Sequence, residues 1–256
     1  MKAQGLPGHY CALDPFRALF KTGLPILLYH KIGRASLLDR RKGLFVSRRV
    51  LAAQLAELKA TGFGFTNLKM INSPGEIVIT FDDGYASSFE QGMRLLESVG
   101  CKAAQFLVSG RIGKVNDWDR TGEPLMDVPQ IREWLSVGHS IGSHTVSHPD
   151  LTRLTLRESR EEISASRKSL EDTFGVAVID FAYPGGSYDE RIVELVQEAG
   201  YSAAVTTEFG VNDAATNTYK LRRICAYRSF REALTCVADT AYATWRRDKR
   251  GRLPAR

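Results

Sequence analysis

Short apolar runs alternate with longer amphipathic segments along most of this chain. The apolar runs have the length and the β-branched content of buried strands. We expect strands at residues 24–30, 77–81, 102–108, 140–143, 178–182, 201–206 and 219–224. Apolar residues at spacings of three and four predict helices at residues 47–61, 87–99, 128–135, 152–174, 188–199 and 230–245. This alternation predicts a parallel sheet with right-handed crossovers.

The stretch 77–84 joins a buried strand to two adjacent carboxylates. Residues 77–79 read Ile-Val-Ile, and Asp82, Asp83 and Gly84 follow shortly after them. Two like charges side by side resist joint ionisation, so a bound cation or a catalytic task would offset the cost. A solvated turn is the alternative, since Asp-Asp-Gly is also good turn chemistry.

A second stretch, residues 142–149, contains two histidines four residues apart. On a helical turn this spacing puts His144 and His148 on one face, with Cβ atoms roughly 5–6 Å apart. Together with Asp83 they would form a two-histidine, one-carboxylate set that leaves positions open for water and substrate. Two incidental surface histidines are the weaker alternative, because three of the five histidines lie between residues 139 and 148.

These two stretches and a third resemble the motifs of a known family. Residues 80–84 (Thr-Phe-Asp-Asp-Gly), 143–149 (Ser-His-Thr-Val-Ser-His-Pro) and 181–186 (Phe-Ala-Tyr-Pro-Gly-Gly) are similar in order and spacing to three motifs of the polysaccharide deacetylases. These proteins are also called NodB-homology proteins or family-four carbohydrate esterases. The resemblance covers roughly residues 24–229. With about seven strand–helix units, it implies an α/β fold, a distorted, incomplete (β/α)7 barrel of the NodB-homology type, whose functional groups lie at the carboxyl ends of strands.

The resemblance implies a role for each motif residue. Asp82 would be the general base, and Asp83, His144 and His148 would bind a divalent metal. Zinc is the default metal, with cobalt, nickel or iron as alternatives. Such a metal polarises the carbonyl and lowers the pKa of water from about 15.7 toward roughly 7. The backbone N–H of Gly185 would donate to the oxyanion of the tetrahedral intermediate.

Candidate substrate-binding residues lie in and near the third motif. Tyr183 and Pro184 belong to the motif itself. The family usually carries an aromatic residue where this chain has Gly185, and Tyr188 or Trp118 could supply the missing ring. For each of these two residues taken singly, ordinary packing on the barrel rim is the favoured interpretation.

Two further departures from the family pattern concern catalysis. Ala182 stands about where many members carry an arginine that orients the base. Arg223 is the candidate replacement, with ordinary ion pairing at the barrel rim as an equal alternative. No histidine follows His148, so the usual late motif that supplies the general acid is absent. His30 resembles the N-terminal histidine of poly-N-acetylglucosamine deacetylase-like members, which are closest in motif order. We expect His30 to be the acid, and a structural histidine at a strand end is the alternative.

Length and composition suit one large α/β domain. The chain has 256 residues, of which 43% are hydrophobic and 25% charged. We divide it into a leader segment (1–23), a catalytic domain (24–245) and a basic tail (246–256). The net charge is +6, and the tail is interpreted as solvated. Weak peripheral contact of the tail with an acidic membrane surface is a minority alternative. Nucleic-acid binding is not expected, because no recognition motif accompanies the charge.

Cysteine usage and the N-terminus bear on the compartment. The spacing of the cysteines predicts neither a disulfide framework nor a zinc ribbon; they are Cys11, Cys101, Cys225 and Cys236. No apolar run is long enough for a signal peptide or a transmembrane segment. We therefore expect a cytoplasmic protein that acts on a precursor inside the cell.

These observations favour a metal-dependent hydrolase that removes an N-acetyl group from an N-acetylhexosamine in a glycan or glycolipid precursor. One alternative keeps the fold and the metal but acts on an N-formyl sugar or a non-sugar amide. Another is a carbohydrate-binding homologue that has lost catalysis. A non-haem iron oxygenase could use the same ligand types, but its chemistry does not need adjacent aspartates.

Overall fold

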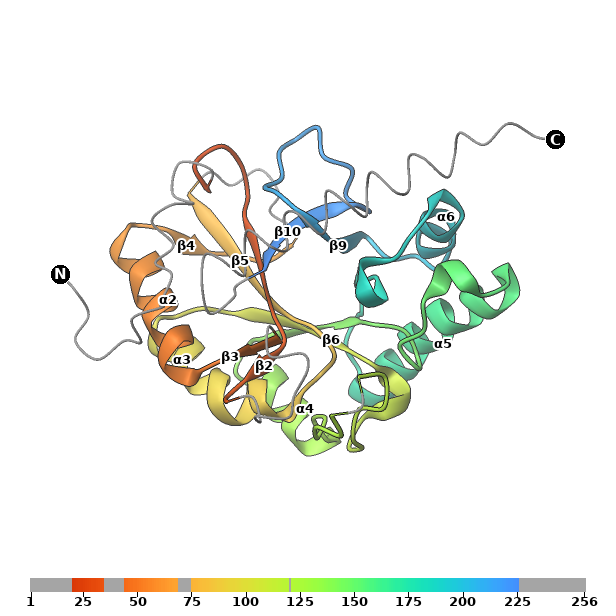
Figure 1. Ribbon diagram of the computed structural model, residues 1–256, viewed down its shortest axis with the longest axis horizontal. Helices are drawn as coiled ribbons and strands as arrows, with labels where there is room; N and C mark the ends of the chain where they lie inside the picture. The colour runs from red at the N-terminus through yellow and green to blue at the C-terminus, as the bar shows by residue number, and fades with distance from the viewer. Residues whose placement is uncertain (1–19, 35–43, 69–74, 120, 226–256) are drawn as a thin grey trace.

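Seven parallel strands form a closed ring in the computed structural model, which describes residues 20–34, 44–68, 75–119 and 121–225. The order around the ring is β1, β10, β9, β8, β7, β6 and β5, and the pairing of β1 with β5 closes it (Figure 1). The strands are β1 (Ile26–Tyr29), β5 (Glu76–Phe81), β6 (Ala103–Leu107), β7 (Ser140–Ser143), β8 (Asp180–Ala182), β9 (Ala203–Phe209) and β10 (Leu221–Cys225). The predicted (β/α)7 barrel is confirmed.

Helices lie around the outside of the ring (Figure 1). They are α2 (Arg48–Ala60), α3 (Met93–Ser98), α4 (Val128–Ser136), α5 (Leu156–Phe174) and α6 (Glu190–Glu198). The connection from β9 to β10, residues 210–220, contains no helix. The strands β7 and β8 share a single register pair, Ser143 with Phe181, and β10 shifts its register against β9. The barrel is therefore incomplete in its helical layer and distorted in its sheet.

Caps explain where the helices begin and end. The Oγ of Ser47 accepts the N–H of Val50 at 3.3 Å, which starts α2 as predicted. Helix α5 begins at Leu156 rather than at residue 152, because Thr155 and Glu158 form a capping box. The turn η5 (Leu151–Arg153) precedes it. The predicted helix at 87–99 begins as a wide turn, η3 (Ser88–Gly92), before α3.

Three short strands have no counterpart in the hydrophobic pattern. They are β2 (Lys31–Ile32), β3 (Phe45–Val46) and β4 (Gly64–Phe65). Strands β2 and β3 pair with each other in a separate two-stranded sheet, and β4 extends the barrel sheet beside β5. Two residues are too few to show a period, so tertiary pairing alone reveals these strands.

The side chains of β5 alternate between two apolar layers. Ile77, Ile79 and Phe81 belong to the large core, whereas Val78 belongs to a smaller cluster. That smaller cluster fills the barrel with Leu24, Ile26, Leu68, Phe106, Ala182, Ala203, Val205 and Leu221. Strand side chains alternate between the two faces. Asp82 lies an even number of residues after Val78, so its side chain lies on the same face as that of Val78, directed into the barrel.

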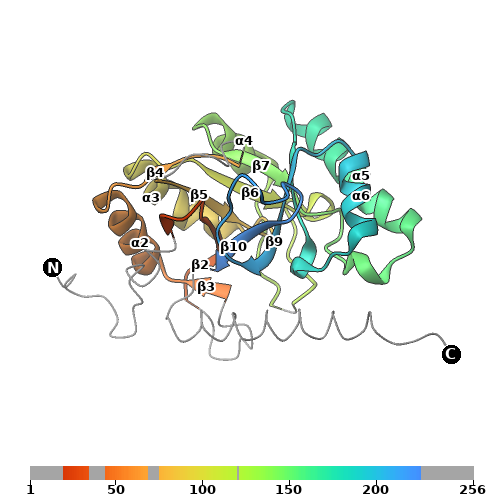
Figure 2. The same ribbon diagram turned by 90° about the horizontal axis from the view of Figure 1, so that it is seen from above.

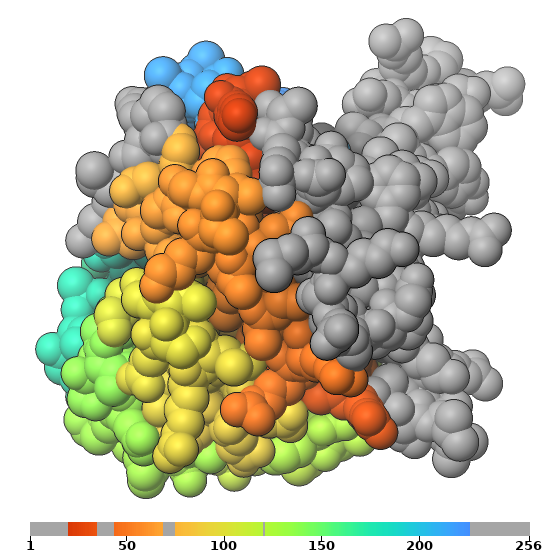
Figure 3. Space-filling model, turned by 90° about the vertical axis from the view of Figure 1, so that its left-hand side faces the viewer, coloured from red at the N-terminus to blue at the C-terminus, as the bar shows by residue number. Residues whose placement is uncertain are grey.

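Neighbouring helices pack against each other at two places around the barrel, α2 against α3 and α5 against α6. Figure 3 shows α2 in orange and α3 in yellow, packed side by side on the outer face. Figure 2 shows α5 and α6 together at the other end of the barrel. Within the described residues, no helix is long and apolar enough to cross a membrane.

Several predictions concern residues outside the described part of the chain. They include most of the leader segment 1–23, the closing helix 230–245, the basic tail 246–256, and Cys11 and Cys236. Membrane contact through the tail therefore stays a prediction. Of the two other cysteines, Cys101 is a buried free thiol and Cys225 is partly buried.

Candidate active site

Asp82 forms a bidentate ion pair with Arg223 inside the barrel. Nη1 and Nη2 of Arg223 donate to Oδ1 and Oδ2 of Asp82, each at 2.7 Å. Nε of Arg223 donates to the carbonyl oxygen of Thr206 at 2.7 Å. Arg223 has no exposed surface, and Asp82 is 2% exposed. A guanidinium bound on both edges has one orientation, so it also fixes the carboxylate. The structure thus brings Arg223 to the group that it is predicted to orient.

The pKa of Asp82 is lowered by this partner. Burial alone would raise the pKa, but the charge and the hydrogen bonds of Arg223, together with smaller effects of His144 and His30, outweigh burial. Asp82 is therefore an ionised carboxylate at neutral pH and can accept a proton.

Asp83, His144 and His148 form a compact cluster next to Asp82. Nε2 of each histidine lies 3.3 Å from Oδ1 of Asp83, and the three ligand atoms lie within 4.8 Å of one another. The histidine side chains are 2% and 15% exposed, and that of Asp83 is 5% exposed. Two imidazole nitrogens and one carboxylate oxygen directed at one point fit a divalent cation. The predicted ligand residues therefore meet in space and fit a metal.

The backbone at this cluster is unusual, and the two histidines do not share a helical turn. Residues 144–150 form an irregular loop after β7. The helical-turn prediction is wrong, because Thr145 and His148 have φ of 69° and 63°. Asp83 has φ of 73°, and these three are the non-glycine residues with positive φ in the described part of the chain. Such conformations cost about 1–3 kcal/mol each and gather at functional sites.

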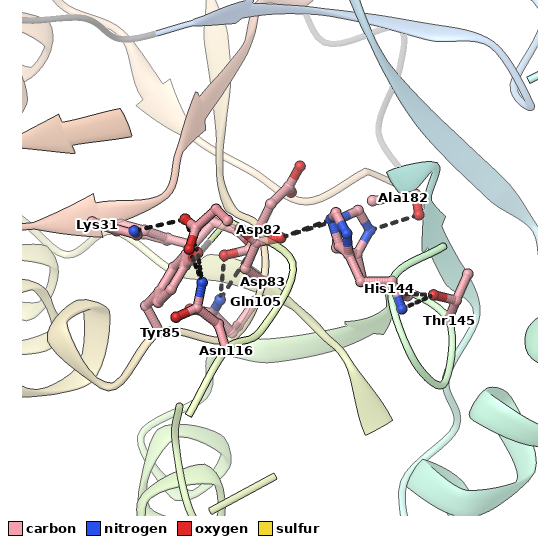
Figure 4. Close-up of polar contacts among 12 residues, drawn as sticks. Lys31, Asp82, Asp83, Tyr85, Gln105, Asn116, His144, Thr145 and Ala182 are labelled. Atoms are coloured by element: carbon pink, nitrogen blue, oxygen red, sulfur yellow. Dashed lines mark hydrogen bonds and ion pairs between the residues drawn. The ribbon is translucent and has the colours of Figure 1, made fainter. Parts of the chain in front are cut away.

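Contacts outside the cluster orient both imidazoles. Nδ1–H of His144 donates to the carbonyl oxygen of Ala182 at 2.7 Å (Figure 4). This bond places the proton on Nδ1 and leaves the lone pair of Nε2 for a metal. The Trp118 ring stacks on the His148 ring, with centroids 4.6 Å apart and planes at 18°. Trp118, a candidate substrate contact, therefore also holds a candidate metal ligand.

Glu162 on α5 binds the loop of residues 144–150, called here the histidine loop. Its carboxylate accepts the N–H groups of Val146 and Ser147 at 2.8 and 2.9 Å. It also accepts the hydroxyl of Ser147 at 2.6 Å. The Oγ1 of Thr145 accepts the N–H of His148 at 3.0 Å. The sequence does not single out Glu162, since several acidic residues share its amphipathic helix.

His30 follows β1 and lies within electrostatic range of the cluster. Burial lowers its pKa, while the charges of Asp83 and Asp82 act to raise it. A lowered pKa makes the protonated imidazole a stronger acid. His30 therefore lies within electrostatic range of both aspartates, and its role as general acid stays a prediction.

Gly185 lies in the tight turn η6 (Pro184–Gly186) with φ of 60° and ψ of 8°. Gly186 and Ser187 donate the two backbone hydrogen bonds of this turn, at 2.9 and 3.1 Å. The N–H of Gly185 takes part in neither bond. A Cβ at Gly185 would meet nothing within 4 Å, so the position of the missing aromatic ring is open. The oxyanion role of this N–H stays a prediction.

Tyr183 and Tyr188 are packed against each other, with ring centroids 5.0 Å apart. Tyr183 has no exposed surface, and its hydroxyl donates to the carbonyl oxygen of Tyr219 at 2.9 Å. Tyr188 is 7% exposed, and its hydroxyl donates to Glu208 at 2.7 Å. Pro184 is also buried. The structure does not present the Tyr183 ring to a substrate, and ordinary packing describes both tyrosines.

A buried charged network lies next to the cluster of Asp83, His144 and His148, and the sequence does not predict it. Lys31 pairs with Asp119, and the hydroxyl of Tyr85 also contacts Asp119. Lys31 and Asp119 are 88 residues apart, so no local pattern could connect them.

Comparisons with known proteins agree with this geometry. A family model described as polysaccharide deacetylase matches residues 69–204. The candidate polysaccharide deacetylase YxkH of Bacillus subtilis is 29% identical over 210 residues, which is 78% of this chain and 70% of that protein. Chitin deacetylase 1 of Cryptococcus neoformans is 27% identical over 182 residues, which is 66% of this chain but only 36% of that longer protein.

Two solved structures share the barrel. The deacetylase PplD of Streptococcus pyogenes, solved in complex with acetate, superposes with a TM-score of 0.73 at 24% identity. The match covers 84% of this chain and 98% of PplD. A polysaccharide deacetylase from Bacillus cereus superposes with a TM-score of 0.70 at 26% identity. That match covers 84% of this chain and 69% of the Bacillus cereus chain.

Proposed function

The chain belongs to the polysaccharide deacetylase family, and we propose that it is a metal-dependent hydrolase that removes an N-acetyl group from an N-acetylhexosamine. We further propose that this sugar is part of a glycan or glycoconjugate precursor and that the metal is zinc. One observation supports the reaction above all: an ionised carboxylate, Asp82, lies beside three convergent ligand atoms.

The residues divide the reaction between them. A divalent metal held by Asp83, His144 and His148 would supply a Lewis acid for the acetyl carbonyl and lower the pKa of water. Asp82 would take the proton of the attacking water as general base, because Arg223 keeps it ionised and oriented.

Two further groups would complete the step. As the water oxygen bonds to the acetyl carbon, the N–H of Gly185 would donate to the developing oxyanion. When the carbon–nitrogen bond breaks, protonated His30 would donate its proton to the leaving nitrogen. The products are acetate and a free amine on the sugar.

The test measures acetate release from N-acetylglucosamine oligomers and N-acetylated sugar lipids. Three forms of the protein are compared: metal-stripped, zinc-reloaded, and zinc-reloaded Asp82→Asn. We expect release from the reloaded protein and none from the other two. The pattern across the panel would then name the substrate class.

Two outcomes would contradict the proposed reaction, and a third would contradict the role proposed for His30. Release that persists after metal removal would exclude the metal-dependent mechanism. Stoichiometric metal binding without release from any acetylated sugar would favour another acyl group or a binding protein. A His30→Ala variant that binds metal and retains near-normal turnover would remove His30 from the acid role.

A further inference from the structure

The buried network beside the candidate metal ligands contains an ion pair, Lys31 with Asp119. Nζ of Lys31 lies 2.9 Å from Oδ2 of Asp119, and the two side chains are 1% and 0% exposed. Nζ also donates to the hydroxyl of Thr121 at 2.9 Å. It lies 4.9 Å from the ring centroid of Phe45 and 4.7 Å from that of Tyr85. Lys31 is therefore enclosed by one carboxylate, one hydroxyl and two aromatic faces.

Stability alone does not account for this ion pair. Removing two charges from water is costly, and replacing a buried pair with apolar residues is often neutral or stabilising. A buried pair can instead select one arrangement of the elements that carry it. The elements joined here are the ones that carry the candidate site.

Each member of the network is a close chain neighbour of a site residue. Lys31 directly follows His30, the candidate acid. Asp119 directly follows Trp118, whose ring stacks on the candidate ligand His148.

Tyr85 supplies the third connection, toward the candidate ligand Asp83, which lies two residues before it. The hydroxyl of Tyr85 donates to Oδ2 of Asp119 at 3.2 Å and accepts Nδ2–H of Asn116 at 3.3 Å. Tyr85 is therefore a buried hydroxyl that bridges Asn116 and Asp119 beside the turn that carries Asp83.

The backbone reinforces the same connection. The N–H of Met126 donates to the carbonyl oxygen of Gly84 at 2.8 Å, and the N–H of Ala86 donates to that of Pro124 at 3.0 Å. The segment that carries Trp118 and Asp119 is thus tied to the turn that carries Asp83.

We propose that Lys31, Asp119 and Tyr85 form a positioning network. The network fixes the positions of His30, Asp83 and Trp118 relative to one another, and thereby sets the metal affinity and the turnover of the site. The inference rests on the proposed function, because it assumes that the cluster binds a metal. It assigns none of the three residues a direct contact with the reacting atoms.

The test separates positioning from stability with a double variant. Lys31→Met and Asp119→Asn each leave a buried charge without its partner, so each single variant should have a lower melting temperature than wild type. Lys31→Met/Asp119→Asn removes both charges and should regain most of that loss. We expect the double variant to bind zinc 10- to 100-fold more weakly than wild type, measured by competition with a chromophoric chelator. Its kcat should fall with KM nearly unchanged.

A second variant keeps the inference testable if the charge variants fail to fold. Tyr85→Phe removes one hydroxyl and should weaken zinc binding about tenfold. Tyr201→Phe is the matched control, because its buried hydroxyl donates to the carbonyl oxygen of Ile163 at 3.0 Å. Tyr201 precedes β9 and so lies at the amino end of the barrel strands, and its variant should bind zinc like wild type.

The outcomes of the two hypotheses are distinguishable. Zinc affinity unchanged in both the double variant and Tyr85→Phe would overturn the positioning network. A wild-type protein that binds no zinc would overturn the proposed function, and the network inference would fail with it.

Discussion

Asp82 and Arg223 are 141 residues apart in the chain and meet through two hydrogen bonds of 2.7 Å. Both side chains are buried, so solvent cannot replace either partner. The relationship connects the first motif to the last strand of the barrel. It also predicts how activity depends on pH.

We predict that Arg223→Met moves the acid limb of the kcat/KM pH profile to higher pH. Arg223 holds the pKa of Asp82 below its usual range. Without the guanidinium, burial raises that pKa and the base is protonated at a higher pH. A nearby opposite charge shifts a carboxyl pKa by about 1–3 units, so the limb should move by at least about one pH unit.

Two companion variants test this explanation. Arg223→Lys keeps the charge but loses the bidentate geometry, so it should restore part of the profile. Arg222→Met is the control, since Arg222 is the exposed neighbour and its loss should leave the profile unchanged. An Arg223→Met enzyme with an unshifted acid limb would show that Asp82 is not the titrating base.

Glu162→Gln should weaken metal binding about tenfold, in the range found when residues that orient metal ligands are replaced. The substitution removes the charge that receives three hydrogen bonds from the histidine loop. Isothermal titration with zinc would measure the effect. Glu161→Gln, at the exposed adjacent position, is the control. Equal zinc affinities for the two variants would mean that the loop needs no such support.

Gly185 and Gly186 should differ sharply in their tolerance of alanine, although both have positive φ, 60° and 71°. At Gly185 a Cβ meets nothing within 4 Å, so alanine costs only the backbone term, about 1 kcal/mol. At Gly186 a Cβ would overlap the side chain of Thr207, which adds roughly 1–3 kcal/mol. Urea unfolding of both variants would measure the difference. Equal losses of stability would contradict the packing described for this turn.

His139 should make the protein less stable as the pH falls from about 6.5 to about 4. Burial, assisted by the charge of Lys102, lowers the pKa of His139 to about 4. The unfolded chain, with a histidine pKa of about 6.5, therefore binds more protons than the native state in this window. Stability rises with pH wherever the unfolded state binds more protons. The loss below the window should be about 2 kcal/mol, after allowance for solvent screening.

The contribution of His139 can be isolated by substitution. Its Nδ1 accepts the N–H of Ala103 at 3.0 Å, and the side-chain oxygen of asparagine can take over this bond. His139→Asn should therefore have a flatter stability profile between pH 4 and about 6.5. Guanidinium unfolding at several pH values would measure both profiles, and parallel curves would assign the pH dependence to other groups.

Local sequence patterns predicted many of the strands and helices of this fold. The apolar run at 77–81 became β5 (Glu76–Phe81), and the run at 140–143 matched β7 (Ser140–Ser143). Helix α2 began where Ser47 predicts it. These elements were predictable because caps and periodicity act within a few residues. The short strands β2, β3 and β4 were not, because pairing with distant partners defines them.

By itself, the sequence determined the chemistry available to the protein. It identified Asp82, Asp83, His144 and His148, because motif order and residue type are properties of the chain. The resemblance of its motifs to a known family also predicted the distorted, incomplete (β/α)7 barrel, and the structure added that the pairing of β1 with β5 closes the ring of strands.

The tertiary structure decided which groups surround that chemistry. It paired Arg223 with Asp82 and Lys31 with Asp119. It buried Tyr183, which the third motif made a substrate candidate. Each of these outcomes depends on side chains from distant segments sharing one low-dielectric space. There an unpaired charge or hydroxyl is costly, and no local sequence pattern records which partner satisfies it.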